Sequence, residues 1–156
     1  MRVFHPLFVH LHIAFFLMAF GAMYAWLFRG LATSVFEDRV YRLSRTSTRL
    51  GVITLVLSMV FGIRDGLHGS IVHFVGLFGG WLTLKAGLAA LLVVVYGLFL
   101  HESGKKKSYL QEDRRIMLWC LLTQAVGIII VAAITTIGTM LVYYPDLLPH
   151  FRGPFR

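Results

Sequence analysis

Four apolar stretches, each about as long as a bilayer is thick, constrain this chain more than any other feature. They cover residues 6–28, 50–67, 72–100 and 116–143. A helix of about 20 apolar residues crosses the hydrocarbon core of a membrane. With 58% hydrophobic and only 14% charged residues, a soluble domain of this length has no means of burying these stretches. We therefore predict one all-α domain, residues 1–156, that forms an integral membrane four-helix bundle.

The positions of the basic residues predict how the bundle is oriented. Ten of them lie in the two connections between the first and second and between the third and fourth stretches: Arg29, Arg39, Arg42, Arg45, Arg49, Lys105, Lys106, Lys107, Arg114 and Arg115. The opposite side carries four: Arg2, Arg64, Arg152 and Arg156. By the positive-inside rule, both termini lie outside a bacterial cytoplasmic membrane. The net charge of +8 is then a topology signal, and we exclude nucleic-acid binding.

The connections and helix ends add detail to this topology. Residues 36–43 have the spacing of a short amphipathic helix at the inner surface, between the first two spans. The third span is long, so either it projects beyond the lipid or residues 71–79 form a separate turn that breaks at Gly79-Gly80; we expect projection. The fourth span starts after Glu112-Asp-Arg-Arg, where acidic residues suit the first helical turn, and it ends before Pro145.

Seven histidines are the candidate functional residues of this apolar chain. His101 is predicted inside, and the other six outside: His5, His10, His12, His68, His73 and His150. An ionisable residue within a membrane span indicates function, although any one of these side chains can also be a solvated interfacial residue. His10, His68 and His73 come from three spans at similar depth, so we expect them to meet in one layer.

Small residues share the helical faces of two of these histidines. His10 is followed on its face by Ala14, Gly21 and Ala25, and His73 is followed by Gly76, Gly80, Thr83, Gly87 and Ala90. Such faces let helices pack closely, and they also leave room for a flat macrocycle whose iron is held by imidazole. We predict a haem b site, or a less favoured copper site, with ligands among His10, His12, His68 and His73. His12 points ~200° away from His10 and is the weaker ligand.

Other polar residues have two interpretations each. Lys85 and Arg64 can pair with haem propionates, or Lys85 can be an interfacial anchor whose ammonium reaches the headgroups. Asp65 is a proton carrier or an ion-pair partner of Arg64. Gln124 is expected to make an interhelical hydrogen bond.

Two resemblances to known families support a small helical membrane protein. Trp81-Leu-Thr-Leu-Lys85, His12-Ile13, Arg29, Gly62 and the linker from Glu37 to Leu43 resemble the HemJ family over roughly 90 residues. The HemJ resemblance implies a haem-b-associated bundle that oxidises protoporphyrinogen, with His12 and Lys85 as functional positions; the related CopD group is linked with copper.

The second resemblance concerns the N-terminal segment. His5-Pro-Leu-Phe-Val-His10-Leu-His-Ile-Ala is similar to the His-Pro-x-x-Val-His-x-Pro-Ile-Ala opening of an uncharacterised family of bacterial four-helix membrane proteins. This similarity implies that His5 and His10 are the important pair.

Three functions follow as hypotheses. The first is a b-type haem-binding subunit that transfers electrons between the quinone pool and a partner membrane or periplasmic redox protein, with quinone as a further cofactor. The second is a HemJ-like protoporphyrinogen oxidase. The third is a non-catalytic accessory subunit of a larger membrane complex, whose histidines are merely interfacial.

Overall fold

The computed structural model describes residues 4–67, 72–105 and 110–149, with side chains throughout except at 4–6, 63–67, 72–78 and 145. These ranges contain four long helices and two short 3₁₀ turns, and no strand. The elements are α1 (Phe4–Thr33), α2 (Asp38–Leu67), α3 (Val72–Lys105), η1 (Leu110–Glu112), α4 (Arg114–Tyr143) and η2 (Pro145–Leu147). The all-α prediction is confirmed for the described residues.

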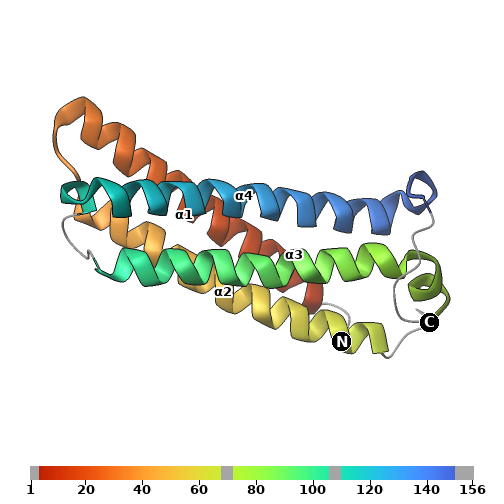
Figure 1. The fold of residues 1–156 in the computed structure, drawn as a ribbon. Coiled ribbons are helices and arrows are strands. Elements are labelled where there is room, and N and C mark those ends of the chain that lie inside the picture. Colours follow the sequence, from red (N-terminus) through yellow and green to blue (C-terminus); the bar gives the residue numbers. More distant parts are fainter. Residues whose placement is uncertain (1–3, 68–71, 106–109, 150–156) are drawn as a thin grey trace.

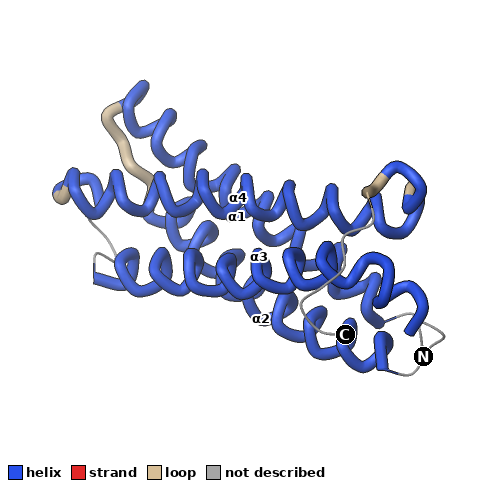
Figure 2. Tube along the Cα trace, turned by 45° about the vertical axis from the view of Figure 1, so that its right-hand side comes forward, coloured by secondary structure: helices blue, strands red, loops and turns tan. Residues whose placement is uncertain are grey.

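The helices form two antiparallel hairpins, α1–α2 and α3–α4, which pack against each other (Figure 1). The α1–α2 and α3–α4 connections lie at one end, at the left of the figure. We call it the basic end because it carries the arginines and lysines of these connections. The start of α1 and the end of α4 lie at the other end, which we call the terminal end. Figure 2 shows from a second direction that the helices of both hairpins are continuous.

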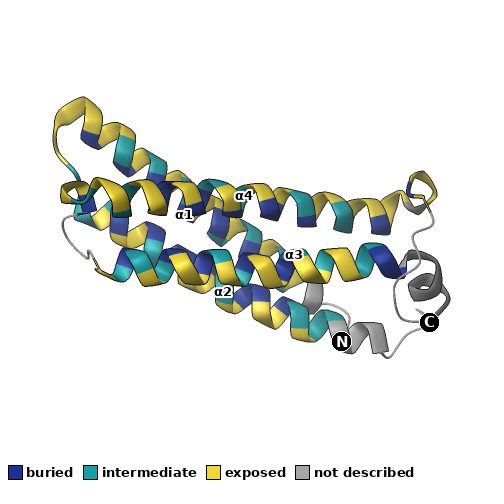
Figure 3. Cartoon of the chain, in the orientation of Figure 1, coloured by how far each residue is buried: buried dark blue, intermediate teal, exposed yellow. Residues whose placement is uncertain are grey.

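Three of the helices have the length and composition of membrane spans within the described residues. The qualifying stretches are Leu7–Thr33, Gly79–Lys105 and Arg114–Tyr143. Their outward faces carry large apolar side chains, such as Ile129 at 67% and Val142 at 70% exposure. Figure 3 shows these exposed faces along α3 and α4. This surface suits contact with lipid chains, since soluble proteins rarely expose continuous apolar faces.

The separate amphipathic helix predicted at residues 36–43 was wrong. This segment forms the first turns of α2, which runs unbroken for 30 residues. No proline interrupts residues 38–67, and the Thr48 hydroxyl donates to the Ser44 carbonyl oxygen within the helix, at 2.9 Å. Tyr41 is only 1% exposed, so one face of residues 38–43 packs against the bundle, while Arg39 and Arg42 on the other face are exposed.

The third helix runs through Gly79-Gly80 without the break that was the alternative expectation, and its projection beyond the lipid stays a prediction. α3 is one continuous helix of 34 residues, which is roughly 51 Å at 1.5 Å per residue and therefore longer than a bilayer core. Figure 1 shows its first turns bent relative to the remainder. The predicted start of α4 is also correct, because Asp113 caps it: the Ile116 amide donates to the Asp113 carboxylate at 3.2 Å.

Two aromatic rings fill the centre of the bundle, one from each hairpin. Phe16 of α1 and Tyr96 of α3 are stacked, with ring centroids 4.3 Å apart, and both are fully buried. Each ring lies against a glycine of its hairpin partner: a Cβ at Gly51 would come within 2.5 Å of the Phe16 ring, and one at Gly127 within 2.5 Å of the Tyr96 ring. Glycine is therefore required at both positions for the rings to fit.

Candidate functional site

The structure places His12, and not His10, on the interior face of α1. His12 is 4% exposed, whereas His10 is exposed. The interior face of α1 continues through large and small side chains alike: His12, Phe16, Ala19, Met23 and Trp26. His12 therefore begins the buried stripe that ends at the basic end, and the ranking of His10 above His12 finds no support in their burial.

His12 is oriented by the backbone of its own helix. Its Nδ1 atom lies 3.0 Å from the Phe8 carbonyl oxygen. A carbonyl oxygen only accepts hydrogen bonds, so Nδ1 carries the proton in this contact and Nε2 carries the lone pair of the neutral ring. The Phe16 ring covers the imidazole from the next turn, with centroids 6.1 Å apart. Metal-binding imidazoles are commonly held in this way, by a carbonyl oxygen that accepts from one ring nitrogen and leaves the other for the metal.

The small-residue faces predicted to line the interior point outward wherever their side chains are described. Ala14, Gly21 and Ala25 of α1 are exposed, and so are Thr83, Gly87 and Ala90 of α3. No atom lies within 4 Å of a Cβ built at Gly21 or at Gly87. The prediction that these faces surround an internal gap was wrong for this part of the chain. Gly80, on the same α3 face, is buried.

Lys85 lies between α3 and α4 in the terminal half of the bundle. Its side chain is half-buried, and its ammonium nitrogen would lie 3.0 Å from a Cβ at Gly138 of α4. Within the described part of the chain, Lys85 makes no ion pair or hydrogen bond. The absence of a side chain at Gly138 thus leaves space that the lysine occupies.

His12 and Lys85 lie at different levels of the same half. Phe16 and Tyr96 mark one level because their rings stack, and α1 and α3 run in the same direction (Figure 1). His12 precedes Phe16 by four residues, while Lys85 precedes Tyr96 by eleven. At 1.5 Å per residue, Lys85 is roughly 10 Å nearer the terminal end.

The other predicted site residues fall wholly or partly outside the described residues. His68 and His150 lie outside them, and the side chains of His5, Arg64, Asp65 and His73 do as well. The predicted meeting of His10, His68 and His73 in one layer therefore stays a prediction. Among the side chains that the structure describes, no three His, Cys, Asp or Glu groups are placed to hold a metal ion together.

A buried polar layer in the basic half went unnoticed in the sequence, apart from Gln124. The Gln124 amide of α4 donates to the Thr48 hydroxyl of α2 at 3.0 Å, which confirms the predicted interhelical bond. The hydroxyl of Ser44 donates to the Ala19 carbonyl oxygen of α1 at 2.8 Å.

The same layer joins α2 to α3. The Tyr41 hydroxyl donates to the Ser103 carbonyl oxygen at 2.8 Å, and Nε of Arg45 donates to the Ser103 hydroxyl at 3.1 Å. The sequence signal for this layer was available: Ser44, Ser47, Thr48, Thr54 and Ser58 recur on one face of a helix.

Comparisons of the chain with protein-family models, with curated proteins and with solved structures find no match. The resemblances to the HemJ family and to the small bacterial four-helix proteins therefore stay predictions. What the geometry offers is one oriented, buried imidazole and one lysine in the same half of an apolar helical bundle.

Proposed function

We propose that the chain is an integral membrane four-helix bundle with both termini outside a bacterial cytoplasmic membrane. Three helices have the composition of spans, and residues 50–67 of α2 supply the fourth. The antiparallel hairpins support an even number of crossings, because α2 returns the chain to the terminal end. The excess of arginine and lysine in the two connections at the basic end assigns that end to the cytoplasm.

Within this bundle we propose a b-type haem site that serves electron transfer between the quinone pool and a partner redox protein. The observation that carries the proposal is His12: it is buried in an apolar interior, and the Phe8 carbonyl holds its Nδ1 so that Nε2 is the ligating atom. An ionisable group at such a position is costly without a function.

The packing limits where this group fits. The stacked Phe16 and Tyr96 rings, seated on Gly51 and Gly127, fill the centre, so a macrocycle bound to His12 would have to lie on the terminal side of these rings. The second ligand would come from His68 or His73, and Lys85 with Arg64 would hold the carboxylates. Bound haem would supply a one-electron carrier. The Phe16 ring would keep water from the imidazole on the side facing the centre.

A pair of histidine variants tests the haem site. We expect purified, haem-supplemented wild-type protein to show Soret and α bands, and His12→Ala to lose most of both. His10→Ala is the matched control: it removes the same side chain two residues away from an exposed position and should keep the bands. A wild-type preparation without a Soret band ends the proposal. If both variants lose the bands equally, His12 is not shown to be a haem ligand.

A non-catalytic accessory subunit is the second candidate, favoured by the outward small-residue faces of α1 and α3. Gly21 and Gly87 have open space around them in the single chain, as helices do where another helix docks closely. Gly21→Leu combined with Gly87→Leu should leave the chain folded and lower the apparent mass of its complex on native gels in mild detergent. An unchanged complex would count against this candidate.

A further inference from the structure

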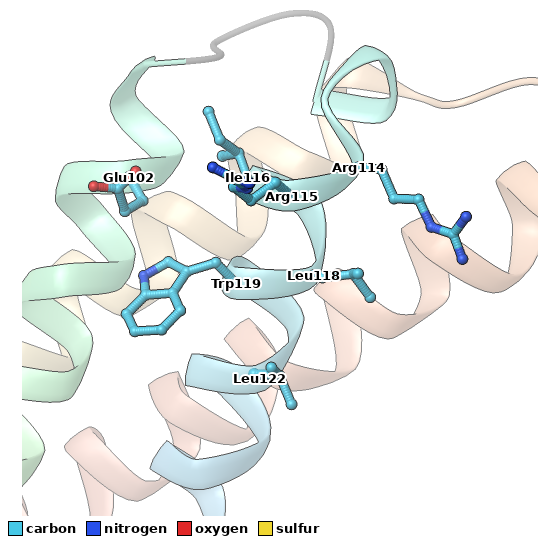
Figure 4. A pocket seen from close by; sticks show the side chains of 7 residues that line it. All are labelled: Glu102, Arg114, Arg115, Ile116, Leu118, Trp119 and Leu122. Atoms are coloured by element: carbon cyan, nitrogen blue, oxygen red, sulfur yellow. The ribbon is translucent and has the colours of Figure 1, made fainter.

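A shallow groove runs along the outer face of α4 at the basic end, beside the last turns of α3 (Figure 4). Seven side chains line it: Glu102, Arg114, Arg115, Ile116, Leu118, Trp119 and Leu122. Arg114 and Arg115 lie at the first turn of α4, with Arg115 on the side of Glu102 and Arg114 pointing away from it, and the apolar side chains of Trp119 and Leu122 follow further along the helix. The groove is therefore amphipathic along the helix axis, with a charged end and a hydrocarbon end.

The charged end is cationic. Arg114 and Arg115 are exposed, and neither forms an ion pair within the described residues. The carboxylate of Glu102 does not neutralise them, because its oxygen is 2.6 Å from the ammonium of Lys105. Two guanidinium groups therefore flank the first turn of α4, Arg115 on the side of Glu102 and Arg114 on the other side (Figure 4), and guanidinium is the side-chain group best matched to phosphate oxygens.

The apolar end is exposed, like the other outward faces of the bundle. Leu118, Trp119 and Leu122 are 47%, 44% and 59% exposed, respectively. Leu122 lies seven residues beyond Arg115, roughly 10 Å along the helix. Trp119 lies between them, at the level that tryptophan prefers in membranes, just below the headgroups.

We propose that this groove binds an anionic glycerophospholipid of the leaflet at the basic end. Its phosphate would bind Arg115, with Arg114 adding a second positive charge at the same helix start, and the first part of one acyl chain would lie along Trp119 and Leu122. Charge complementarity and the length of the apolar wall select this occupant, because a free phosphate would leave the wall uncovered. The proposal rests on membrane insertion and is independent of the haem site.

Lipid-dependent quenching of tryptophan fluorescence tests the proposal on the full chain in bilayers. One bilayer contains a minor fraction of phosphatidylglycerol, brominated on its upper acyl carbons, in unlabelled phosphatidylcholine. The other contains the same fraction of brominated phosphatidylcholine in an otherwise identical bilayer. The fluorescence of Trp119 is obtained as the difference between the wild type and Trp119→Phe. We expect the brominated phosphatidylglycerol to quench this signal more strongly, with an apparent enrichment that falls roughly fivefold for each arginine removed.

The controls separate a built groove from general surface charge. Arg114→Gln with Arg115→Gln should abolish the enrichment. Arg39→Gln with Arg42→Gln, which changes two exposed arginines at the same end of α2, should leave it intact. If both brominated lipids quench Trp119 equally, the proposed lipid binding in the groove is wrong. It is also wrong if both double variants lose the same share of the enrichment. If neither brominated lipid quenches Trp119, membrane insertion of this end of α4 is overturned.

Discussion

At the scale of single residues, two glycines hold the centre of the bundle together. Gly51→Ala and Gly127→Ala each place a methyl group about 2.5 Å from an aromatic ring carbon, so the stacked pair of Phe16 and Tyr96 must shift. Overpacking of this kind costs about 1–3 kcal/mol. We expect each variant to lose that much free energy of unfolding, measured by titrating the folded protein in mild detergent with a denaturing detergent.

Two other helical glycines provide matched controls. Gly21 and Gly87 have no atom within 4 Å of a built Cβ, and alanine is favoured over glycine in a helix by roughly 0.5–1 kcal/mol. Gly21→Ala and Gly87→Ala should therefore keep or slightly raise the stability. A similar loss at all four positions would show that the contacts of Phe16 and Tyr96 do not decide the outcome.

The candidate site shows which residue-scale features the sequence can predict. Histidine content and depth identified His12 and His10 together, but sequence did not tell which of them faces inward. In a soluble protein the apolar face is the buried face. In lipid both faces are apolar: Met23 is buried and Leu17 is 53% exposed on the same helix. Residue size does not decide either, because Ala19 is buried beside Met23 whereas Gly21 is exposed.

At the scale of elements, the start of α4 depends on one side chain. Asp113 has an extended backbone and its carboxylate accepts from the Ile116 amide, which satisfies one of the free donors of the first turn. Asp113→Ala should cost about 1 kcal/mol, or roughly 2–4 °C in Tm for a chain of this size. Circular dichroism on heating measures the change.

Replacing Asp113 with asparagine tests whether loss of the cap causes this change in Tm. Asparagine caps helices nearly as well as aspartate, so Asp113→Asn should melt close to the wild type. If Asn and Ala variants melted together at the lower temperature, the negative charge beside Arg114 would matter more than the cap.

The sequence predicts helix boundaries well where the chain is apolar and poorly where it is polar. The starts of α1 and α4 fall within two residues of the predicted spans. α2 begins at Asp38, twelve residues before the predicted span. The intervening segment contains Ser44, Ser47, Thr48 and four arginines, a composition that is typical of a protein surface. The hydroxyls of Ser44 and Thr48 form hydrogen bonds within α2 or with neighbouring helices, whereas the buried Ser47 hydroxyl has no partner among the described residues. Most of this polar sequence is therefore compatible with a buried helix.

At the scale of the whole molecule, α2 is the element that decides the topology. It is the least apolar of the four helices, and hydrogen bonds from its first half reach α1, α3 and α4. These bonds give the polar half a protein environment in place of lipid. If α2 crosses the membrane with its neighbours, Ser34 and Leu147 lie on opposite sides; if it does not, the odd number of crossings puts them on the same side.

Cysteine labelling distinguishes these two topologies. Cys120 is fully buried and is the single cysteine of the chain, so Cys120→Ala gives a background without thiols. Into it we would place Ser34→Cys, at an exposed position in the α1–α2 connection, or Leu147→Cys, at a position 75% exposed in η2. We expect a membrane-impermeant maleimide to label Leu147→Cys in intact cells and Ser34→Cys only after the membrane is permeabilised. Labelling of both from the outside, or of neither, would mean that α2 stays on one side of the membrane, and the proposed even number of crossings would have to be abandoned.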